Sequence, residues 1–505
     1  MEDLMQMLLG GEEFQKMEDT PQMVTQHVCS ALPEPPVAAA APLYHAGLEL
    51  SPNGVDRISA LPASLLRNIV SRLPVKDAAR TTVLSRVWSR AWRSASPVPL
   101  VLVDAHLLPC GDLTVPVSRA LAAHPGPFRG IYLTGTPLDA HRAEVSRWLR
   151  LFAAKGVEEL TLFNRAQTMA ANPPLPDTLF NCSSLTRLYL GFWRFPDTAA
   201  LPDTHTACFP YLLELGLCAL LMEQRDIAFL IEKCPVLEKL VIVGSRHPVY
   251  LRIESRSLIC VQVCSAVVPE IVISDAVSLK RLLLWEAWGP GCLANMRCRI
   301  KIGHSPNLQS LGFLVPGMHE LQIGDTLIEV GGEATVPSLQ ILAVQVRLGA
   351  SREAKKLPVL LRCFPNIDTL IVQCEKNVKD HFRGASPKLH QQFWRTTNAM
   401  KCVKVSLKEL VLHGFQGTVM EMEFLKFIAR HGNVLNSIVV FTSHPFKPAM
   451  IKQLESIPFA SDSCSGVLLV AQFEEGTPWC YKRGFALSIR NPFDVTYCLS
   501  GPCGT

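Results

Sequence analysis

A six-residue pattern, Leu-x-x-Leu-x-Leu with Val, Ile or Phe at some of its apolar positions, recurs through the middle of the chain. Nine copies start at Val157, Leu185, Leu212, Leu237, Leu258, Leu279, Leu308, Leu339 and Ile367. The fourth residues of successive copies are 28, 27, 25, 21, 21, 29, 31 and 28 residues apart. Such short alternating runs indicate strands with one buried face, which a single strand cannot bury alone. The spacing therefore predicts stacked units whose neighbouring strands share a core.

This period is typical of leucine-rich repeats, so we predict a solenoid over residues 98–397 with parallel strands on its concave face. Side chains alternate along each strand, and the residue between the last two apolar positions points away from the core. In the first six copies we predict that this residue contacts a bound target: Thr161, Tyr189, Gly216, Val241, Gln262 and Leu283. Their mixed, weakly charged character favours a protein or peptide target.

A helical segment precedes the repeats. Apolar residues recur at every fourth position from Leu61 to Leu73, which predicts a helix that Pro74 ends. Two further short helices are predicted near Asp77 and Trp88. Eighteen of the 35 residues in Ile58–Trp92 are apolar, and a unit this small cannot bury them all in its own core. Part of this surface should therefore face a partner or pack on the downstream repeats.

Charge separates this helical segment from the rest of the chain. The 505 residues carry a net charge of +5, which gives no support for a protein dominated by nucleic-acid binding. Residues 56–93 alone contain eight Lys or Arg against Asp56 and Asp77. This excess fits either a DNA-binding helical unit or one that docks an acidic protein. The second is favoured because arginines alternate with apolar residues on every helix instead of gathering on one recognition helix.

The sequence contains few motifs that indicate a catalytic or metal-binding site. The sequence has no phosphate-binding loop, nucleophile elbow, H-E-x-x-H motif or paired C-x-x-C, so we predict neither cofactor nor metal and no catalytic residue. The 17 cysteines are scattered through a chain large enough for a core, and we interpret them as reduced, buried thiols. Without a secretory signal or a membrane-spanning run, we expect a cytoplasmic or nuclear protein. Phe393 and Trp394, in an insertion at 381–397, are candidates for a partner-contact loop.

Residues 56–88, from Asp56-Arg57-Ile58-Ser59-Ala60-Leu61-Pro62 to Val83-Leu84-Ser85-Arg86-Val87-Trp88, closely resemble a plant-type F-box. The run from Leu407-Lys408-Glu409-Leu410-Val411-Leu412 to Thr418, followed by Glu423-Phe424-Leu425-Lys426-Phe427-Ile428, resembles an FBD segment, which implies a strand, a glycine-bounded turn and an amphipathic helix. With the repeats between them, the chain is similar to the plant F-box, leucine-rich-repeat and FBD proteins. We expect an α/β protein: a flexible arm at 1–50, a three-helix F-box at 51–97, the solenoid at 98–397, an FBD-like capping segment at 398–445 and a C-terminal cap at 446–505.

The resemblance implies a non-catalytic receptor. In that family the F-box binds the Skp-type adaptor of a cullin–RING ubiquitin ligase, and the repeats hold a target protein; no membrane partner is implied. The matching adaptor contacts are Leu61, Pro62, Leu65, Ile69, Val83, Leu84 and Trp88. The sequence departs from the family pattern at Ala63-Ser64, where an acidic pair is usual, and at Val87, where a basic residue is usual. A leucine-rich scaffold with a degenerate F-box and no ligase role is the alternative.

Overall fold

The structure is a computed structural model. It describes residues 28, 31–37, 58–93, 98–107, 112–124, 126–164, 172–200, 208–245, 247–288, 297–328, 334–348, 351–374, 393–442, 447–471 and 480–493. The chain divides into two compact units, Met1–His247 and Pro248–Thr505. Most of the predicted arm at 1–50 lies outside the described residues, but Val28, Ala31 and Val37 are described and buried.

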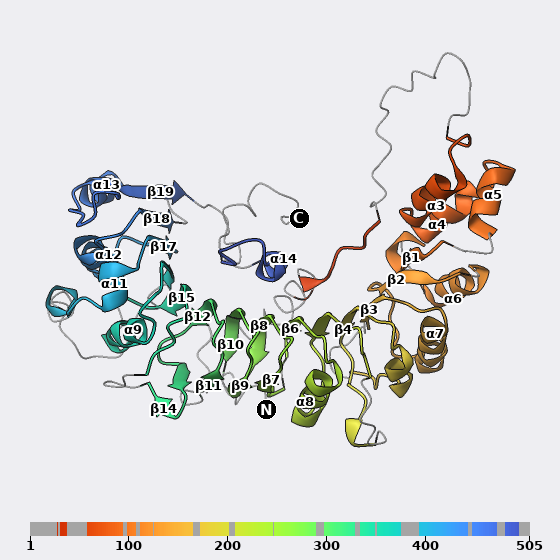
Figure 1. Ribbon diagram of the computed structural model, residues 1–505, viewed down its shortest axis with the longest axis horizontal. Helices are drawn as coiled ribbons and strands as arrows, with labels where there is room; N and C mark the ends of the chain where they lie inside the picture. The colour runs from red at the N-terminus through yellow and green to blue at the C-terminus, as the bar shows by residue number, and fades with distance from the viewer. Residues whose placement is uncertain are drawn as a thin grey trace, which may run out of the picture. The chain divides into compact units, whose positions relative to one another are not determined.

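The first unit contains helices followed by a parallel sheet of order β1-β2-β3-β4-β5-β6. Its helices are α3 (Ala63–Ser71), α4 (Val75–Thr81), α5 (Arg86–Arg93), α6 (Thr114–Ala123), α7 (Arg142–Ala154) and α8 (Gln224–Lys233), with short 3-10 helices at Asp104–His106, Asp177–Asn181 and Thr198–Ala200. Its strands are β1 (Leu100–Val103), β2 (Phe128–Leu133), β3 (Glu159–Phe163), β4 (Arg187–Gly191), β5 (Glu214–Cys218) and β6 (Lys239–Val243). Figure 1 shows α7 and α8 on one side of these strands.

The second unit contains a parallel sheet of order β8-β10-β12-β15-β16-β17-β18-β19 and a smaller sheet of order β14-β13-β11-β9-β7. The first has strands β8 (Cys260–Val267), β10 (Arg281–Trp288), β12 (Ser310–Leu314), β15 (Ile341–Val346), β16 (Thr369–Cys374), β17 (Glu409–His413), β18 (Ser437–Thr442) and β19 (Val467–Ala471). The second has β7 (Tyr250–Glu254), β9 (Glu270–Asp275), β11 (Cys298–His304), β13 (His319–Ile323) and β14 (Thr326–Leu327). The helices are α9 (Ser351–Cys363), α11 (Lys401–Val405), α12 (Val419–His431), α13 (Pro448–Glu455) and α14 (Tyr481–Phe485).

Each of the nine predicted repeat strands is present. In the first unit they are β3 to β6, and in the second they are β8, β10, β12, β15 and β16. The apolar residues of one repeat pair with those of the next in register, as in Leu160 with Leu188 and Leu188 with Leu215. All three leucines are buried, so the shared core predicted from the pattern is confirmed.

The two shortest repeats return to the sheet through a strand in place of a helix. The steps of 21 residues, from Leu240 to Val261 and from Val261 to Leu282, contain β7 and β9. A strand advances about 3.3 Å per residue and a helix about 1.5 Å, so a strand covers the return path with fewer residues. The smaller sheet, which the sequence did not predict, continues through the next two steps of 29 and 31 residues, which contain β11, β13 and β14.

The predicted FBD segment extends the parallel sheet formed by the repeats. β17 pairs with β16, and β18 pairs with both β17 and β19, all in parallel. Helix α12 starts at a capping box, in which Thr418 accepts a hydrogen bond from the Glu421 amide and the Glu421 carboxylate accepts one from the Thr418 amide. The helix that the sequence predicted here is thus present and longer than expected.

Three further expectations can be compared with the described residues. The mixed α/β fold class, with N-terminal helices, repeats and a C-terminal segment of strand and helix, is confirmed. The described cysteines are free, and all except Cys208 and Cys480 are buried. Within the described part of the chain, no helix has the length and apolarity that a bilayer crossing requires.

Candidate functional site: an apolar helical surface and the inner faces of the two sheets

The three-helix unit 58–93 leaves an apolar surface exposed. Leu66, Val70, Val75 and Trp92 are buried, and α4 packs on β1, next to which Pro74 bridges to Val101. Five large apolar side chains stay exposed: Ile58 at 57%, Leu65 at 50%, Val83 at 84%, Leu84 at 66% and Val87 at 40%. The unit therefore packs on the downstream domain, as one of the two alternatives predicted, and it also leaves apolar surface exposed; that this surface faces a partner stays a prediction.

The seven predicted adaptor contacts differ in accessibility. Leu65, Val83 and Leu84 are among the exposed residues, and Pro62 is also exposed. Leu61 and Ile69 are half-buried. Trp88 is buried, and its indole Nε1 donates a hydrogen bond to the Ser59 Oγ at 3.0 Å. Trp88 thus anchors the segment that leads into α3, while Val83 and Leu84 form an exposed turn between α4 and α5.

The six predicted target contacts occupy the expected face but are not accessible. Thr161, Tyr189, Gly216 and Val241 form one row across β3 to β6, and Gln262 pairs with Leu283 across β8 and β10. All six are nevertheless buried. The expectation that this row is open to a target is therefore wrong for the structure as it stands.

Two kinds of cover lie on this face of the strands. The first is local: the Tyr189 ring lies across Gly216, where an added Cβ would meet ring carbon Cδ1 at 2.2 Å. The second comes from segments distant in sequence. Val37 packs with Val101, Val103 and Tyr132 in the first unit, and α14 covers Gln262 in the second. Neither cover could be read from the repeat pattern, because both depend on which side chains and segments lie over the sheet.

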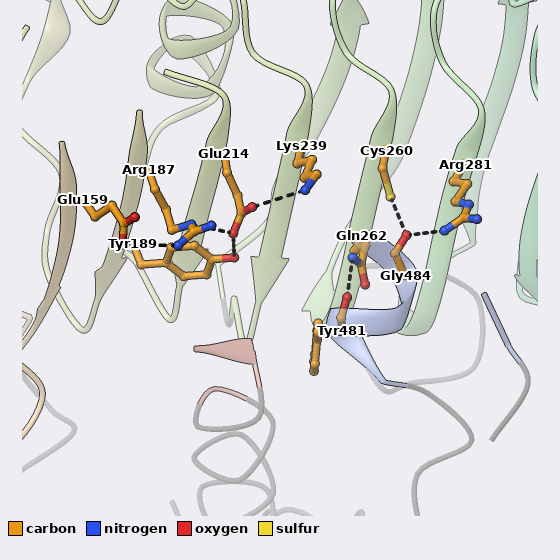
Figure 2. Close-up of polar contacts among 10 residues, drawn as sticks. All are labelled: Glu159, Arg187, Tyr189, Glu214, Lys239, Cys260, Gln262, Arg281, Tyr481 and Gly484. Carbon is orange, nitrogen blue, oxygen red and sulfur yellow. Dashed lines mark hydrogen bonds and ion pairs between the residues drawn. The ribbon is translucent and has the colours of Figure 1, made fainter. Parts of the chain in front are cut away.

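A row of alternating charges crosses the inner face of the first unit, defined as the face of its strands opposite α7 and α8. Glu159, Arg187, Glu214 and Lys239 occupy equivalent positions on β3 to β6. Arg187 lies 3.3 Å from a carboxylate oxygen of each flanking glutamate, and the Lys239 Nζ lies 3.6 Å from Glu214 (Figure 2). We call these four residues the ladder; together with Thr186, Leu213 and Glu238 they line a pocket of about 140 Å³.

Two tyrosines complete the ladder. The Tyr189 hydroxyl donates to Glu214 at 2.8 Å, and the Tyr132 hydroxyl donates to Glu159 at 2.5 Å. Burial raises the pKa of both phenols, and the neighbouring carboxylates raise it further. The charges of the ladder are therefore paired within the first unit, and each of its two carboxylates contacts a cation and a phenol.

The inner face of the second unit, opposite its smaller sheet, is occupied by the chain itself. Residues 480–493, which include α14 and are called the strap, lie over β8 and β10 (Figure 2). Arg281 is in the third position of its repeat pattern, as Arg187 is in its own. Among the described residues, however, its guanidinium donates hydrogen bonds to main-chain carbonyls of the strap. Burial lowers the pKa of this guanidinium.

Comparison with known proteins agrees with this organisation. The F-box domain model matches residues 58–98, the model for the repeats of "FBD-associated F-box protein At5g56370" matches 145–372, and the FBD model matches 396–440. The chain therefore contains an F-box domain, leucine-rich repeats and an FBD domain, and it is similar to F-box/FBD/LRR-repeat proteins of Arabidopsis thaliana. F-box domains in general bind Skp1-type adaptors, and their combination with repeats suggests a substrate-adaptor role in F-box protein complexes.

Three relatives from Arabidopsis thaliana illustrate the similarity. The chain is 32% identical over 190 residues to "F-box/FBD/LRR-repeat protein At1g13570", covering 36% of this chain and 43% of the relative. It is 33% identical over 196 residues to "F-box/LRR-repeat protein At3g26922", covering 38% and 61%. The match to "F-box/FBD/LRR-repeat protein At5g56420" is 25% identical over 441 residues and covers 81% of this chain and 98% of the relative. The first two matches thus span less than two thirds of those relatives.

Within this F-box protein, sequence reasoning missed the ladder, Arg281 and the strap. A signal for the ladder was present, since the third position of four successive repeats reads Glu, Arg, Glu and Lys. Neighbouring parallel strands bring such residues side by side. The prediction that Trp394 lies in a partner-contact loop is wrong. Its side chain is buried against Phe424 and Phe427, so it belongs to the core under α12. Residues 381–392 of that insertion lie outside the described residues.

No metal centre is indicated either. In the part of the chain that the structure describes, no group of three or more His, Cys, Asp or Glu side chains is arranged to hold a metal ion. His319 illustrates the alternative use of a polar group: its Nδ1 accepts from the Val315 amide at 3.1 Å, and its Nε2 lies 2.9 Å from the Ala287 carbonyl. Burial lowers the pKa of this imidazole, so it serves as a neutral structural link between β10 and β13.

Proposed function

We propose that this protein is the substrate-recognition subunit of a Skp–cullin–F-box type E3 ubiquitin ligase. Its F-box would dock the adaptor and its repeats would hold a target protein near the ubiquitin-charged enzyme. The observation that carries the proposal is the exposure of Ile58, Leu65, Val83, Leu84 and Val87 within an F-box whose helices α3 and α4 also pack on β1. An exposed apolar cluster on so small a unit is typical of a protein interface.

The proposal assigns different tasks to the candidate residues. Leu61, Pro62, Leu65 and Ile69, with Val83 and Leu84, would contact the adaptor. Trp88 would position this surface from beneath, because its indole is buried and bonded to Ser59. Arg72, Lys76, Arg80, Arg86 and Arg90 are exposed around the same unit. They would favour an adaptor with an acidic surface by accelerating association.

Under this proposal the chain makes and breaks no covalent bond. It raises the local concentration of a target beside catalytic subunits, which can increase the rate of modification without new chemistry. The proposal places the protein in the cytoplasm or the nucleus.

Co-purification of the full chain with a Skp-type adaptor tests the proposal. We expect Val83→Asp with Leu84→Asp to reduce adaptor binding at least tenfold, and Leu61→Ala with Pro62→Ala to reduce it as well. The matched control is Val115→Asp on α6, which changes a side chain of 53% exposure outside the F-box. Absence of a complex with any adaptor, or equal loss in the control, would favour the repeat scaffold with a degenerate F-box.

A further inference from the structure

The strap is held to the inner face of the second unit by side chains of the sheet that bind its main chain. The Gln262 Nε2 donates to the Tyr481 carbonyl at 3.1 Å, and the Cys260 Sγ lies 3.5 Å from the Gly484 carbonyl oxygen (Figure 2). Recognition of this kind depends on backbone geometry, so a segment of different sequence but similar path could satisfy it.

Arg281 provides the largest group of these contacts. Its Nη1 donates to the carbonyls of Gly484 at 2.7 Å, Ala486 at 3.2 Å and Arg483 at 3.3 Å, and its Nη2 donates to that of Ile489. These carbonyls belong to the C-terminal end of α14 and the turn that follows it; those of Arg483 and Ala486 also accept from the main-chain amides of Ala486 and Ile489. Among the described residues, no carboxylate lies within ion-pair distance of Arg281, in contrast to Arg187 in the ladder.

Shape and aromatic contacts add selectivity. A Cβ at position 484 would lie 2.5 Å from the Gln262 Oε1, and Gln262 is fully buried, so only glycine fits at the closest approach. At the far end of the strap, the Phe493 ring meets Phe313 edge to face, with centroids 5.2 Å apart. A small residue, a group of carbonyls and an aromatic ring are therefore what this face recognises.

The surface beneath the strap is compatible with removal of the strap. Gln262 and Arg281 are polar, as is Asp368, whose carboxylate pairs with Arg490. Water can solvate these groups once they are uncovered, whereas uncovering an apolar core leaves a large apolar area in water. Because the covered surface includes these polar groups beside the apolar Phe313, uncovering it should cost less than uncovering a wholly apolar core, which suits a binding surface.

We propose that the inner face of β8, β10 and β12 is a peptide-binding surface, and that the strap is its displaceable occupant. A target segment would replace the strap by presenting a tight turn with a small residue against Gln262, main-chain carbonyls to Arg281 and an aromatic ring to Phe313. This inference rests on the proposed function, since it names where the repeats hold their target. It also explains why Gln262 and Leu283 lie in the expected row and are nevertheless buried.

Binding of the strap sequence in trans tests the inference. The probe is a fluorescent 14-residue peptide with the sequence of Cys480–Phe493, titrated against the full-length chain. A tethered segment competes at an effective concentration on the order of millimolar, so the wild-type chain should bind the peptide weakly. Gly484→Val in the chain should displace its own strap and tighten peptide binding at least tenfold. Gly466→Val is the matched control, because a Cβ at 466 meets nothing within 4 Å; it should behave as the wild type.

Two further variants make the test specific. A peptide carrying Gly484→Val should not bind the opened chain, and Arg281→Met combined with Gly484→Val in the chain should abolish binding of the unaltered peptide. Hydrogen exchange of residues 480–493 should increase in the Gly484→Val chain while β8 and β10 remain protected.

The inference is overturned if the opened chain does not bind the peptide, or if Gly484→Val unfolds β8 and β10, since the strap would then be a permanent part of the core. Equal binding by the wild-type chain and the variant would also overturn it. These results are independent of the adaptor experiment, which depends on the F-box in the other unit.

Discussion

Arg187 and Arg281 occupy the same position of the repeat pattern in different units, and their surroundings differ. Arg187 lies between Glu159 and Glu214 on the flanking strands. Arg281 lies between Cys260 and Ser310, neither of which balances its charge at neutral pH, and it binds carbonyls of the strap. A buried cation needs compensation, and a neighbouring strand or a distant segment can supply it. The first arginine is compensated by neighbouring strands, while the second is compensated by a segment that is distant in sequence.

The largest expected effect comes from breaking the ladder at Glu214. We expect Glu214→Ala to destabilise the first unit by about 2–4 kcal/mol, since it leaves Arg187, Lys239 and the buried Tyr189 hydroxyl without this partner. Hydrogen exchange of β4 to β6 measures the change. Glu238→Ala is the control on the rim of the same pocket, with an expected change within about 0.5 kcal/mol. Equal effects of the two variants would show that the ladder does not stabilise the unit.

Matched substitutions of the two arginines sharpen the comparison. Arg187→Met should cost about 1–2 kcal/mol in the first unit, because two partly buried carboxylates lose their shared cation. Arg281→Met should change protection of β8 and β10 by less than about 1 kcal/mol, because the strap carbonyls can turn to water. In the Arg281→Met variant, hydrogen exchange of the strap, residues 480–493, should instead accelerate several-fold. If Arg281→Met destabilises its sheet as strongly as Arg187→Met does, the proposed difference between the units is wrong.

Alkaline pH should act on the first unit through its buried phenols. The pKa values of Tyr132 and Tyr189 are raised in the fold, so above about pH 10 the unfolded chain ionises first and stability falls. The loss approaches about 1.4 kcal/mol per pH unit for each tyrosine. Denaturant titrations at pH 10 and 11 should show a smaller loss for Tyr132→Phe with Tyr189→Phe than for the wild type. Equal losses of stability in the wild type and the double variant would contradict this prediction. The strands of the second unit's main sheet contain no tyrosine, so we expect no such loss from them.

The smallest effect concerns the exposed end of the strap. Arg490, whose side chain is 65% exposed, pairs with Asp368, and such pairs contribute about 0–1 kcal/mol. We expect Arg490→Ala to raise strap exchange no more than about fivefold, and 0.5 M salt to produce a similar change in the wild type. An effect as large as that of Arg281→Met would mean that the ion pair, and not the carbonyl contacts, holds the strap.

Much of the fold was predictable because it depends on local periodicity. Nine repeat strands and the F-box helices follow from apolar spacing, and the resemblance to an FBD segment implied the helix that is present as α12 (Val419–His431). The smaller sheet was not predicted although β7 alternates buried and exposed residues. The prediction rested on the nine copies of the Leu-x-x-Leu-x-Leu pattern, and these copies form strands of the main sheets only. Trp394 was misassigned because its partners Phe424 and Phe427 are distant in sequence from the loop that carries it.

The sequence by itself determined the parts of this protein: an F-box, repeat strands and an FBD-like segment; that the strands of this segment continue the parallel sheet was decided by the tertiary structure. It also determined which residues of each strand point away from the core. Only the tertiary structure decided which of those residues are reachable, because accessibility depends on the Tyr189 ring lying over Gly216 and on the strap lying over Gln262. A local pattern specifies the direction of a side chain, but whether another part of the chain covers it is a property of contacts between distant segments.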